Sequence, residues 1–422
     1  MRILLTGASG FIGSALAAAL AQRGHEVVRV GRGASADVQA DFAHVPSRQW
    51  WEPKLAGVDA VINAVGILRE QRGQSFDALH TRAPIELFEA CAAAGVPRVV
   101  QVSALGADAQ ARSRYHLSKK AADDALRALP LSAAIVQPSL VYGAGGSSAQ
   151  LFNGLALAPL LMLPGRGAMQ VQPVHLRDVV DGIVALVEAP PSRTATYAFA
   201  GPEALSMREY LSQLRERLGT RAPLRVLGLP AALFRWGARA AGVLPGSMLD
   251  AETADMLLRG NAAPDNALPA LLGRPPMPVR RFLEPGQVPA ARTDAILFWW
   301  LPLLRVSIAL VWLWTGVVSL GLYPVQESYA LLGRVGLHGA AASVALYGAA
   351  LLDLAFGALT LVAPAAWRRR LWPAQAALIA GYSALITLFL PEYWLHPYGP
   401  LSKNLPMIAG IGLLWAMEPR KR

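Results

Sequence analysis

At 422 residues the chain is long enough for two or more domains, and its apolar fraction of 54% is too high for an ordinary soluble protein. The composition therefore predicts that part of the chain lies in lipid. The formal net charge of +11 comes from dispersed arginines and from basic clusters beside C-terminal apolar segments, which indicates a membrane surface and argues against a nucleic-acid partner. The single cysteine, Cys91, excludes a disulfide within the chain.

The chain opens with RILLTGASGFIG (Arg2–Gly13), which predicts a buried strand, a glycine-rich turn and a helix. Glycines let the backbone approach a pyrophosphate, and the helix N-terminus offers unpaired N–H groups and a partial positive charge. Such a turn also occurs with nothing bound, so context decides. We expect a dinucleotide site formed by Thr6, Gly7, Ser9, Gly10, Phe11, Ile12 and Gly13. No signal-peptide core precedes this turn, so the N-terminal part is expected in the cytoplasm.

The end of the second predicted strand, His25–Gly31, is where such folds distinguish between two cofactors. An acidic residue there binds the ribose 2′-hydroxyl of NAD, whereas an arginine accommodates the 2′-phosphate of NADP. Arg32 therefore favours NADP(H), with NAD(H) as the alternative cofactor and a solvated loop arginine as the alternative role. Asp41 is expected either at the adenine edge or in an exposed turn.

Strands and helices then alternate along the chain. Apolar runs predict strands over Val58–Gly66 and Arg98–Ser103, with a helix over Ala83–Ala94 between them. This alternation predicts an α/β fold with a Rossmann-type, doubly wound parallel sheet and helices on both of its faces.

Tyr115 and Lys119 lie four residues apart at the start of an alanine-rich helix. Because residues at this spacing share one helix face, the lysine ammonium is expected to lower the tyrosine pKa from about 10 and make the phenol a proton donor and acceptor. Ser103, at the end of its strand, is placed to hydrogen-bond a substrate oxygen. The alternative is a surface tyrosine and lysine on an amphipathic helix.

With these motifs, roughly residues 1–285 resemble a short-chain dehydrogenase/reductase of the extended or atypical type. The turn matches the cofactor loop of that family, the segment Gln137–Gly143 (QPSLVYG) is similar to its substrate-side turn, and Ser103, Tyr115 and Lys119 match its catalytic set. The resemblance implies further cofactor contacts from Asn63, Ala64, Val65, Gly66, Tyr115, Lys119 and Pro138, and no metal site.

Three segments, Val61–Glu70, Phe76–His80 and Val102–Ala107, are similar to the NADPH-binding accessory subunit of respiratory complex I and its bacterial relatives. Some members of that subgroup hold NADPH without turnover. The resemblance therefore implies either an NAD(P)-dependent oxidoreductase or a non-catalytic, NADPH-binding assembly or redox-sensing protein of a respiratory or quinone-linked membrane complex. Asn63 stands where many extended members carry a histidine, which leaves its role near the nicotinamide open.

The chain beyond the catalytic motif is expected to form the substrate side. Glycines and prolines between residues 143 and 172 predict a loop-rich substrate lip, in which Arg166 meets an anionic substrate group or lies exposed. His175 is expected to be structural. A helix capped by Ser206 is predicted over Leu205–Leu218. Many prolines then predict a substrate-side cap that ends in a linker.

Four apolar stretches follow, and they predict an all-α transmembrane four-helix bundle. The stretches are Ala295–Leu320, Gly339–Val362, Leu371–Leu390 and Leu405–Met417. The fourth is short, so a re-entrant or tilted end piece is the alternative. The segment resembles the DoxX-like family of small four-helix membrane domains, most clearly at His396–Leu405 (HPYGPLSKNL).

Basic residues predict the orientation of the bundle. In a four-span arrangement the three basic clusters share one side, which the positive-inside rule makes cytoplasmic. The clusters are Arg280, Arg281 and Arg292, then Arg368, Arg369 and Arg370, and finally Arg420, Lys421 and Arg422. Arg305 and Asp353 lie inside spans and are expected to face each other in the bundle interior, as an ion pair or as a polar site for a quinone-like or lipid headgroup.

Together these patterns predict three domains, an NAD(P)-binding domain over residues 1–220, a cap and linker over 221–292, and a DoxX-like membrane domain over 293–422. The expected protein is a multi-pass oxidoreductase of the inner or cytoplasmic membrane that contacts membrane lipid and acts on a carbonyl or hydroxyl of an apolar substrate. Tyr115 would be its acid and base, Lys119 would bind the nicotinamide ribose, and Ser103 would polarise the substrate oxygen.

Overall fold

The computed structural model describes residues 1–422 except 72, 191, 243–249 and 419–422. The chain forms two compact units, Met1–Ala295 (unit 1) and Ile296–Arg422 (unit 2). The last of the three basic clusters, Arg420, Lys421 and Arg422, lies outside the described residues.

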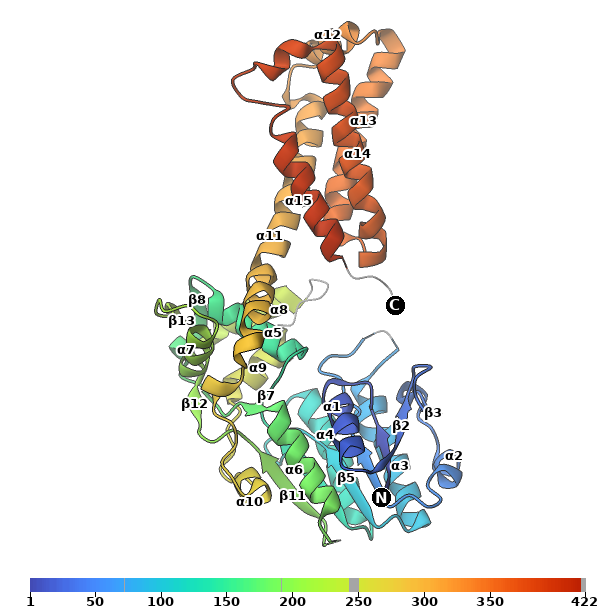
Figure 1. Ribbon diagram of the computed structural model, residues 1–422. Helices are drawn as coiled ribbons and strands as arrows, with labels where there is room; N and C mark the ends of the chain where they lie inside the picture. The colour runs from blue at the N-terminus through green and yellow to red at the C-terminus, as the bar shows by residue number, and fades with distance from the viewer. Residues whose placement is uncertain (72, 191, 243–249, 419–422) are drawn as a thin grey trace. The chain divides into compact units, whose positions relative to one another are not determined.

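Unit 1 is built, within the described residues, on a seven-stranded sheet in the order β11-β6-β5-β4-β1-β2-β3, and its paired strands all run parallel (Figure 1). Its strands are β1 (Arg2–Thr6), β2 (Glu26–Gly31), β3 (Val38–Gln39), β4 (Ala60–Asn63), β5 (Arg98–Val102), β6 (Ala133–Pro138) and β11 (Ala195–Phe199). Apolar residues bury both faces of the central strands, as a parallel sheet covered on both sides requires. The predicted α/β fold is confirmed.

Helices cover the two faces because successive strand residues point to opposite sides. Ile3 and Leu5 pack in the cluster with α1 (Phe11–Gln22) and α6 (Leu176–Glu188). Leu4 packs in the opposite cluster, with α3 (Ala83–Ala94) and α4 (Arg114–Ala128). The short elements α2 (Arg48–Trp51), η1 (Phe42–His44), η2 (Glu52–Lys54) and the π-helical turn η3 (Asp77–Arg82) complete this layer. The carboxyl ends of the strands therefore form one edge, where the predicted site residues gather.

The region between residues 143 and 172 is not the loop-rich lip that its glycines and prolines predict. It contains α5 (Ser147–Leu157), β8 (Leu161–Pro164), the turn η4 (Gly165–Gly167) and β9 (Gln170–Val171). Ala149, Phe152 and Ala156 of α5 are buried in one core cluster with residues of α7 (Met207–Arg217). That contact with a later helix stabilises α5, while Arg166 lies exposed.

The remaining substrate-side elements pair with one another. β13 (Val226–Leu229) runs parallel to β8, β10 (Val174–His175) pairs with β7 (Val141–Tyr142), and β12 (Leu205–Ser206) pairs with β9. The helices are α8 (Ala231–Gly242), α9 (Ala251–Arg259) and α10 (Leu268–Leu272). Ser206 caps α7 through a capping box with Glu209, which confirms the predicted helix start.

The proline-rich segment before unit 2 packs against unit 1 instead of forming an extended linker. Val279, Phe282 and Leu283 are buried in the core cluster that contains α5 and α7. Short helical turns η5 (Val279–Arg281) and η6 (Pro285–Gln287) lead into the next helix. His175 caps α6, since its Nδ1 accepts the N–H of Arg177 at 3.2 Å, and its ring contacts Phe282, so the residue is structural as expected.

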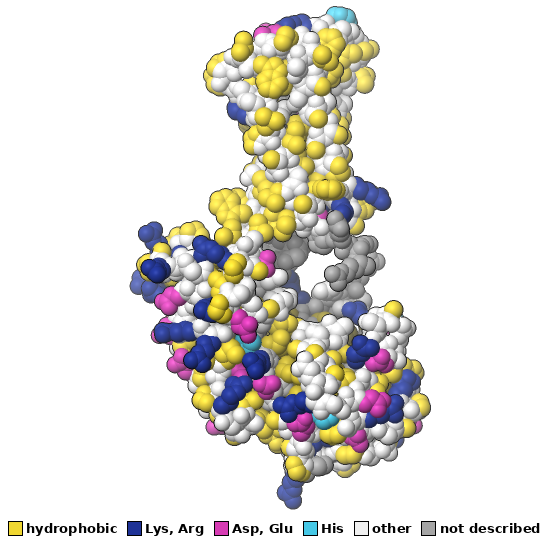
Figure 2. All heavy atoms as spheres, in the orientation of Figure 1, with side chains coloured by type: hydrophobic (Ala, Val, Ile, Leu, Met, Phe, Trp, Pro, Cys, Tyr) yellow, Lys and Arg dark blue, Asp and Glu magenta, His cyan; other side chains and the backbone are white. Residues whose placement is uncertain are grey.

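Unit 2 is helical, and three helices of the described chain are long and apolar enough to cross a membrane. Its elements are α11 (Val288–Val317), which begins in unit 1, the π-helical turn η7 (Val318–Leu322), α12 (Val325–Arg334), α13 (Gly339–Val362), α14 (Ala365–Phe389), the turn η8 (Pro391–Trp394) and α15 (Asn404–Met417). Figure 2 shows that few charged side chains interrupt the hydrophobic surface of this unit. With 14 residues, α15 is about 21 Å long, shorter than a bilayer core of about 30 Å.

Arg305 and Asp353 do not face each other as predicted. Helices α11 and α13 pack so closely that a Cβ on Gly357 would lie 2.6 Å from Leu313 Cγ and one on Gly316 would lie 2.7 Å from Leu354 Cγ. In this antiparallel register Asp353 lies near the level of Gly316, about three turns from Arg305. Arg305 instead pairs with Glu418 at 3.5 Å.

Buried polar side chains inside unit 2 differ in how far their hydrogen bonds are satisfied. Trp312 Nε1 donates to Gln375 Oε1 at 2.9 Å, and Gln375 Nε2 donates to Thr360 Oγ1 at 2.8 Å, so these buried groups satisfy one another. Asp353 is only 4% exposed, and its Oδ1 has no hydrogen-bond partner among the described residues.

Candidate functional site

The glycine-rich turn forms a cradle at the start of α1. Gly7 has φ +70°, and a Cβ on Gly13 would lie 2.1 Å from the carbonyl oxygen of Gly7, so only glycine fits there. Gly10 caps α1 without a side-chain hydrogen bond, which leaves the N–H groups of Phe11 and Ile12 to a ligand. Ser9 lies exposed in the same turn. The cradle and the open helix N-terminus fit the pyrophosphate of a dinucleotide.

The side chain of Asn63 forms hydrogen bonds within the sheet. Its Oδ1 accepts from Thr6 Oγ1 at 2.6 Å, and its Nδ2 donates to Gln101 Oε1 at 2.7 Å. The side chain thus links the ends of β1, β4 and β5, and any contact with a cofactor would come from the backbone around it. A Cβ on Gly7 would lie 2.7 Å from Ala64 C, which places the backbone after β4 directly against the glycine turn.

Three predicted cofactor residues lie outside the glycine turn, on other strand ends and turns. Arg32 follows β2 with an exposed side chain. Asp41 caps η1, since its Oδ1 accepts the N–H of Ala43 at 3.0 Å, so its carboxylate serves a turn. Pro138 ends β6 and is buried, and its carbonyl accepts the N–H of Leu105 at 2.9 Å.

Lys119 connects α4 to the strand ends. Its side chain is 4% exposed, and Nζ donates to the carbonyl oxygens of Val65 at 3.2 Å and Val102 at 3.1 Å. A Cβ on Gly66 would lie 3.2 Å from Nζ, so this glycine leaves room for the ammonium. Burial lowers the pKa of Lys119 to about 8.

Tyr115 lies one turn before Lys119, as the spacing predicts, but its acidity differs from the prediction. Burial raises the pKa of Tyr115 to about 12, and the negative charge of Asp123 adds to the rise. The expectation that Lys119 lowers this pKa is therefore wrong for the free protein, because the ammonium points at two carbonyl groups and desolvation dominates. The phenol packs edge-on against His80, with ring centroids 5.5 Å apart.

His80 is a site residue that the sequence analysis did not single out. The N–H of Ile67 donates to Nε2 at 3.0 Å, which leaves the proton on Nδ1, and Nδ1 donates to Ser118 Oγ at 3.0 Å. Ser118 Oγ in turn donates to the carbonyl of Tyr115 at 2.8 Å. Burial and the nearby charge of Lys119 lower the pKa of His80 to about 2, so the ring is neutral and holds the first turn of α4 in place.

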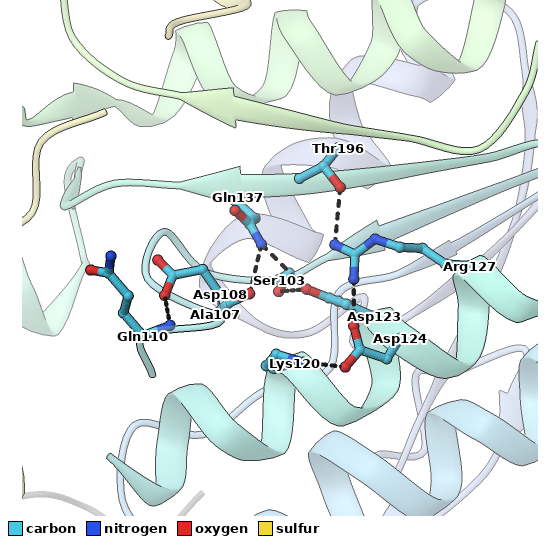
Figure 3. Close-up of polar contacts among 10 residues, drawn as sticks. All are labelled: Ser103, Ala107, Asp108, Gln110, Lys120, Asp123, Asp124, Arg127, Gln137 and Thr196. Carbon is cyan, nitrogen blue, oxygen red and sulfur yellow. Dashed lines mark hydrogen bonds and ion pairs between the residues drawn. The ribbon is translucent and has the colours of Figure 1, made fainter. Parts of the chain in front are cut away.

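Asp123 is a second residue that sequence reasoning missed. It lies one turn beyond Lys119 on α4 and is fully buried. Its Oδ2 accepts from Ser103 Oγ at 2.5 Å and from Gln137 Nε2 at 3.4 Å (Figure 3). The spacing of Tyr115, Lys119 and Asp123, four residues apart on one face, was the available signal. Ser103, predicted to bond the substrate, thus gives its proton to a carboxylate.

Two cavities adjoin the residues around Tyr115. One of about 180 Å³ is lined by Phe76 and Glu252 among others, and one of about 170 Å³ by His116 and Arg259 among others. Phe76 and His116 both contact the Tyr115 ring. Helix α9 contributes to both cavities, and Glu252 Oε1 accepts the N–H of Tyr115 at 2.8 Å, so this helix covers the start of α4.

Comparison with known families agrees with this geometry. Residues 3–198 match the NAD dependent epimerase/dehydratase family, and residues 309–412 match the DoxX-like family. The chain joins an NAD(P)-binding domain of the epimerase and short-chain dehydrogenase/reductase type to a DoxX-like domain. The DoxX-like domain and the three apolar helices indicate association with a membrane.

Two curated relatives resemble the N-terminal domain. A ceramide reductase of Caulobacter vibrioides is 30% identical over 44% of this chain and 61% of its own length. The NADH dehydrogenase [ubiquinone] 1 alpha subcomplex subunit 9 of Arabidopsis thaliana mitochondria is 32% identical over 48% of this chain and 54% of its own. The chain thus spans between half and two thirds of these relatives.

Solved structures share the fold of unit 1. A nucleoside-diphosphate-sugar epimerase from Staphylococcus aureus matches 67% of this chain and 99% of its own, with a TM-score of 0.54 and 17% identity. A short-chain dehydrogenase/reductase superfamily protein from Agrobacterium tumefaciens, with bound NAD, matches 70% and 98%, with a TM-score of 0.51 and 16% identity. At these identities the likeness concerns the fold.

Proposed function

We propose that the protein is a membrane-anchored, NADP(H)-dependent oxidoreductase that acts on a carbonyl or hydroxyl group of an apolar substrate. The observation that carries the proposal is the position of α4, which sets Tyr115 and Lys119 at the strand edge that also holds the glycine cradle. The likeness to a ceramide reductase supports a lipid or another long-chain compound as the substrate. An isoprenoid or a quinone precursor has the same apolar chemistry.

Tyr115 and Lys119 have different roles at this site, since the tyrosine carries the proton and the lysine carries a positive charge. A bound nicotinamide supplies or accepts the hydride. Tyr115 holds a proton at its phenol oxygen, because a pKa of about 12 keeps it protonated at neutral pH, and such a phenol donates that proton to the oxygen of a reduced carbonyl. Lys119 holds its ammonium one turn away, against the carbonyl oxygens of Val65 and Val102, where it would bind the nicotinamide ribose.

The preference for NADP(H) rests on the end of β2. Gly31 closes the strand, and Arg32 presents an exposed guanidinium there, where an acidic residue would instead select NAD. NAD(H) is the alternative cofactor. A guanidinium binds a phosphate through two parallel hydrogen bonds, which matches the 2′-phosphate of the adenosine ribose.

The membrane unit is proposed to anchor this chemistry as a multi-pass domain of the cytoplasmic membrane, with unit 1 in the cytoplasm. One basic cluster, Arg280, Arg281 and Arg292, precedes the apolar part of α11, and the other, Arg368, Arg369 and Arg370, follows α13. Two membrane crossings, by α11 and α13, separate the clusters and place both on the same side. Cytoplasmic placement of both clusters agrees with the positive-inside rule. Tethering raises the local concentration of a substrate that is dissolved in the same membrane.

The test uses the full chain in lipid nanodiscs with NADPH and a total membrane lipid extract, while the absorbance of NADPH is followed. We expect steady NADPH consumption that Tyr115→Phe reduces at least about 100-fold, because general acid catalysis contributes that much, while NADPH binding is retained. Lys120→Gln, one residue beyond Lys119 but directed at the surface carboxylate of Asp124, is the control and should leave turnover unchanged. Equal turnover in wild type and Tyr115→Phe would contradict the proposal.

A second candidate is an NADPH-binding assembly or redox-sensing protein that does not turn over its cofactor. The match to a subunit of mitochondrial NADH dehydrogenase favours it, as does the direction of the Lys119 ammonium toward two carbonyl groups instead of the phenol. NADPH that co-purifies with the protein and is never consumed, together with recovery of a respiratory or quinone-linked membrane protein, would favour this candidate.

A further inference from the structure

Asp123 is a buried carboxyl group with only half of its hydrogen-bonding capacity used. Oδ2 accepts from Ser103 at the end of β5 and from Gln137 on β6, whereas Oδ1 has no partner among the described residues. An ionised carboxylate offers about four acceptor positions, and burial without partners is costly. The anion is therefore poorly compensated, although its neighbour Asp124 pairs at the surface with Lys120 and Arg127 (Figure 3).

The nearby charges of Lys119 and Arg127 favour the anion of Asp123, but both cationic groups are directed at other partners. Lys119, on the same helix, directs its Nζ to the carbonyl oxygens of Val65 and Val102. Arg127, one turn beyond, donates to Asp124 and to Thr196 of β11. The contacts from the sheet are the uncharged Ser103 and Gln137. Burial accordingly outweighs these neighbours and raises the pKa of Asp123 to about 6.

The protonation state of this carboxyl group determines which hydrogen bond Ser103 can make with a substrate. When Asp123 is ionised, the hydroxyl proton of Ser103 is directed at Oδ2, and the free lone pairs of Oγ can only accept a hydrogen bond. When Asp123 is protonated, its O–H can donate to Ser103 Oγ, and the hydroxyl proton of the serine is released for another acceptor. A substrate carbonyl requires the second state, whereas a substrate hydroxyl can donate in the first.

We propose that Asp123 is a positioning residue that sets the hydrogen-bond direction of Ser103 and thereby selects a carbonyl or a hydroxyl substrate at the site. The inference rests on the proposed function and deepens it. In carbonyl reduction one hydride adds to the carbonyl carbon and one proton passes from Tyr115 to the carbonyl oxygen. The proton of Asp123 stays between its carboxyl group and Ser103, so it is not consumed.

The first test compares the pH dependence of NADPH consumption in the full chain, with the same total lipid extract as the substrate source. In wild type, reduction should fall about tenfold from its low-pH plateau at one pH unit above the pKa of Asp123. Asp123→Asn removes the titrating group without changing the shape of the side chain. The fall in NADPH consumption above the pKa of Asp123, which is the high-pH limb of the profile, should then disappear. Asp124→Asn removes the same charge from the exposed face of α4 and should retain the limb.

The second test does not depend on turnover, and its first measurement uses the wild type alone. Infrared difference spectra of the wild type should show the C=O stretch of a protonated carboxyl group that grows as the pH falls through about 6. Ser103→Ala should shift the frequency of this band, because the variant loses the hydroxyl bonded to Oδ2. Asp124→Asn should leave the band unchanged.

The outcomes separate this inference from the function on which it rests. A limb that survives in Asp123→Asn, or a wild-type band that Ser103→Ala does not shift, would overturn the role of Asp123 while oxidoreductase activity stands. A wild type that never consumes NADPH would remove the proposed function and the role of Asp123 with it. Loss of the limb in Asp123→Asn alone, together with the band shift, would support the assignment.

Discussion

Gly66 lies directly against the Lys119 ammonium at the strand ends. A Cβ at position 66 would lie 3.2 Å from Nζ and 3.6 Å from His80 Nε2, so the lysine has to move by a few tenths of an ångström if a methyl group is added. Because small misplacements at a reacting centre are costly, we expect Gly66→Ala to lower NADPH consumption about tenfold. Steady-state kinetics with the full chain would measure this loss.

The matched control is Gly237→Ala, in α8, where an added Cβ meets nothing within 4 Å. This variant should keep wild-type kinetics and gain slightly in stability, since alanine favours a helix over glycine by about 1 kcal/mol. Equal kinetics for Gly66→Ala and wild type would show that the position of Nζ is not limiting.

At the scale of single residues, the sequence predicts which residues form the site and which helix face they share better than it predicts which partners their side chains contact. The four-residue interval places Tyr115 and Lys119 on one face of α4, where the structure has them. The partners of Lys119 are the carbonyl groups of Val102 at the end of β5 and of Val65 just after β4, 17 and 54 residues away, and no local pattern indicates them. Asn63 shows the same limit, because its hydrogen bonds to β1 and β5 depend on the register of the assembled sheet.

At the scale of elements, close packing of α11 and α13 depends on Gly316 and Gly357, and the contact at Gly357 can be tested by mutation. A Cβ on Gly357 would lie 2.6 Å from Leu313 Cγ and 3.0 Å from the carbonyl oxygen of Ala309. Helices in lipid associate through such small residues. We expect Gly357→Ala to force the helices apart and to destabilise unit 2 by about 1–3 kcal/mol, the usual effect of overpacking. Thermal unfolding in detergent would detect it.

The same helix supplies the control for this prediction. Gly348 also lies on α13, but an added Cβ there meets nothing within 4 Å. Gly348→Ala should therefore leave the unfolding temperature unchanged or slightly higher. A similar loss in both variants would mean that helix propensity or solubility, and not the contact with α11, limits the stability of the bundle.

Element prediction succeeded where apolar spacing is regular and failed where stability comes from a distant contact. The helix over Ala83–Ala94 has the bounds that its sequence predicts. Helix α5 was missed because its surroundings are rich in glycine and proline, which mark its ends but hide the apolar residues Ala149, Phe152 and Ala156. Those residues become a helix face only against α7, which begins 50 residues after α5 ends.

At the scale of the whole molecule, the composition of the chain predicts where the two units divide, but it does not predict which polar groups pair inside unit 2. The change beyond residue 292 lies close to the boundary between Ala295 and Ile296. The partner of Arg305 depends on how far α11 and α13 slide past each other, which hydropathy does not reveal. The resulting pair with Glu418 also includes Arg368 Nε, at 2.6 Å, and joins α11, α14 and the residue after α15.

The orientation of unit 2 gives a last prediction, which the single cysteine makes accessible. Cys91 is fully buried, and burial raises its thiol pKa to about 12, so a membrane-impermeant maleimide should not label the wild type. Leu395 is 90% exposed between α14 and α15, and Arg370 is exposed near the start of α14. With the basic cluster in the cytoplasm, Leu395→Cys should be labelled in intact cells and Arg370→Cys only after permeabilisation. The reverse pattern would invert the proposed topology, and labelling of both residues from outside would mean that α14 does not cross the membrane.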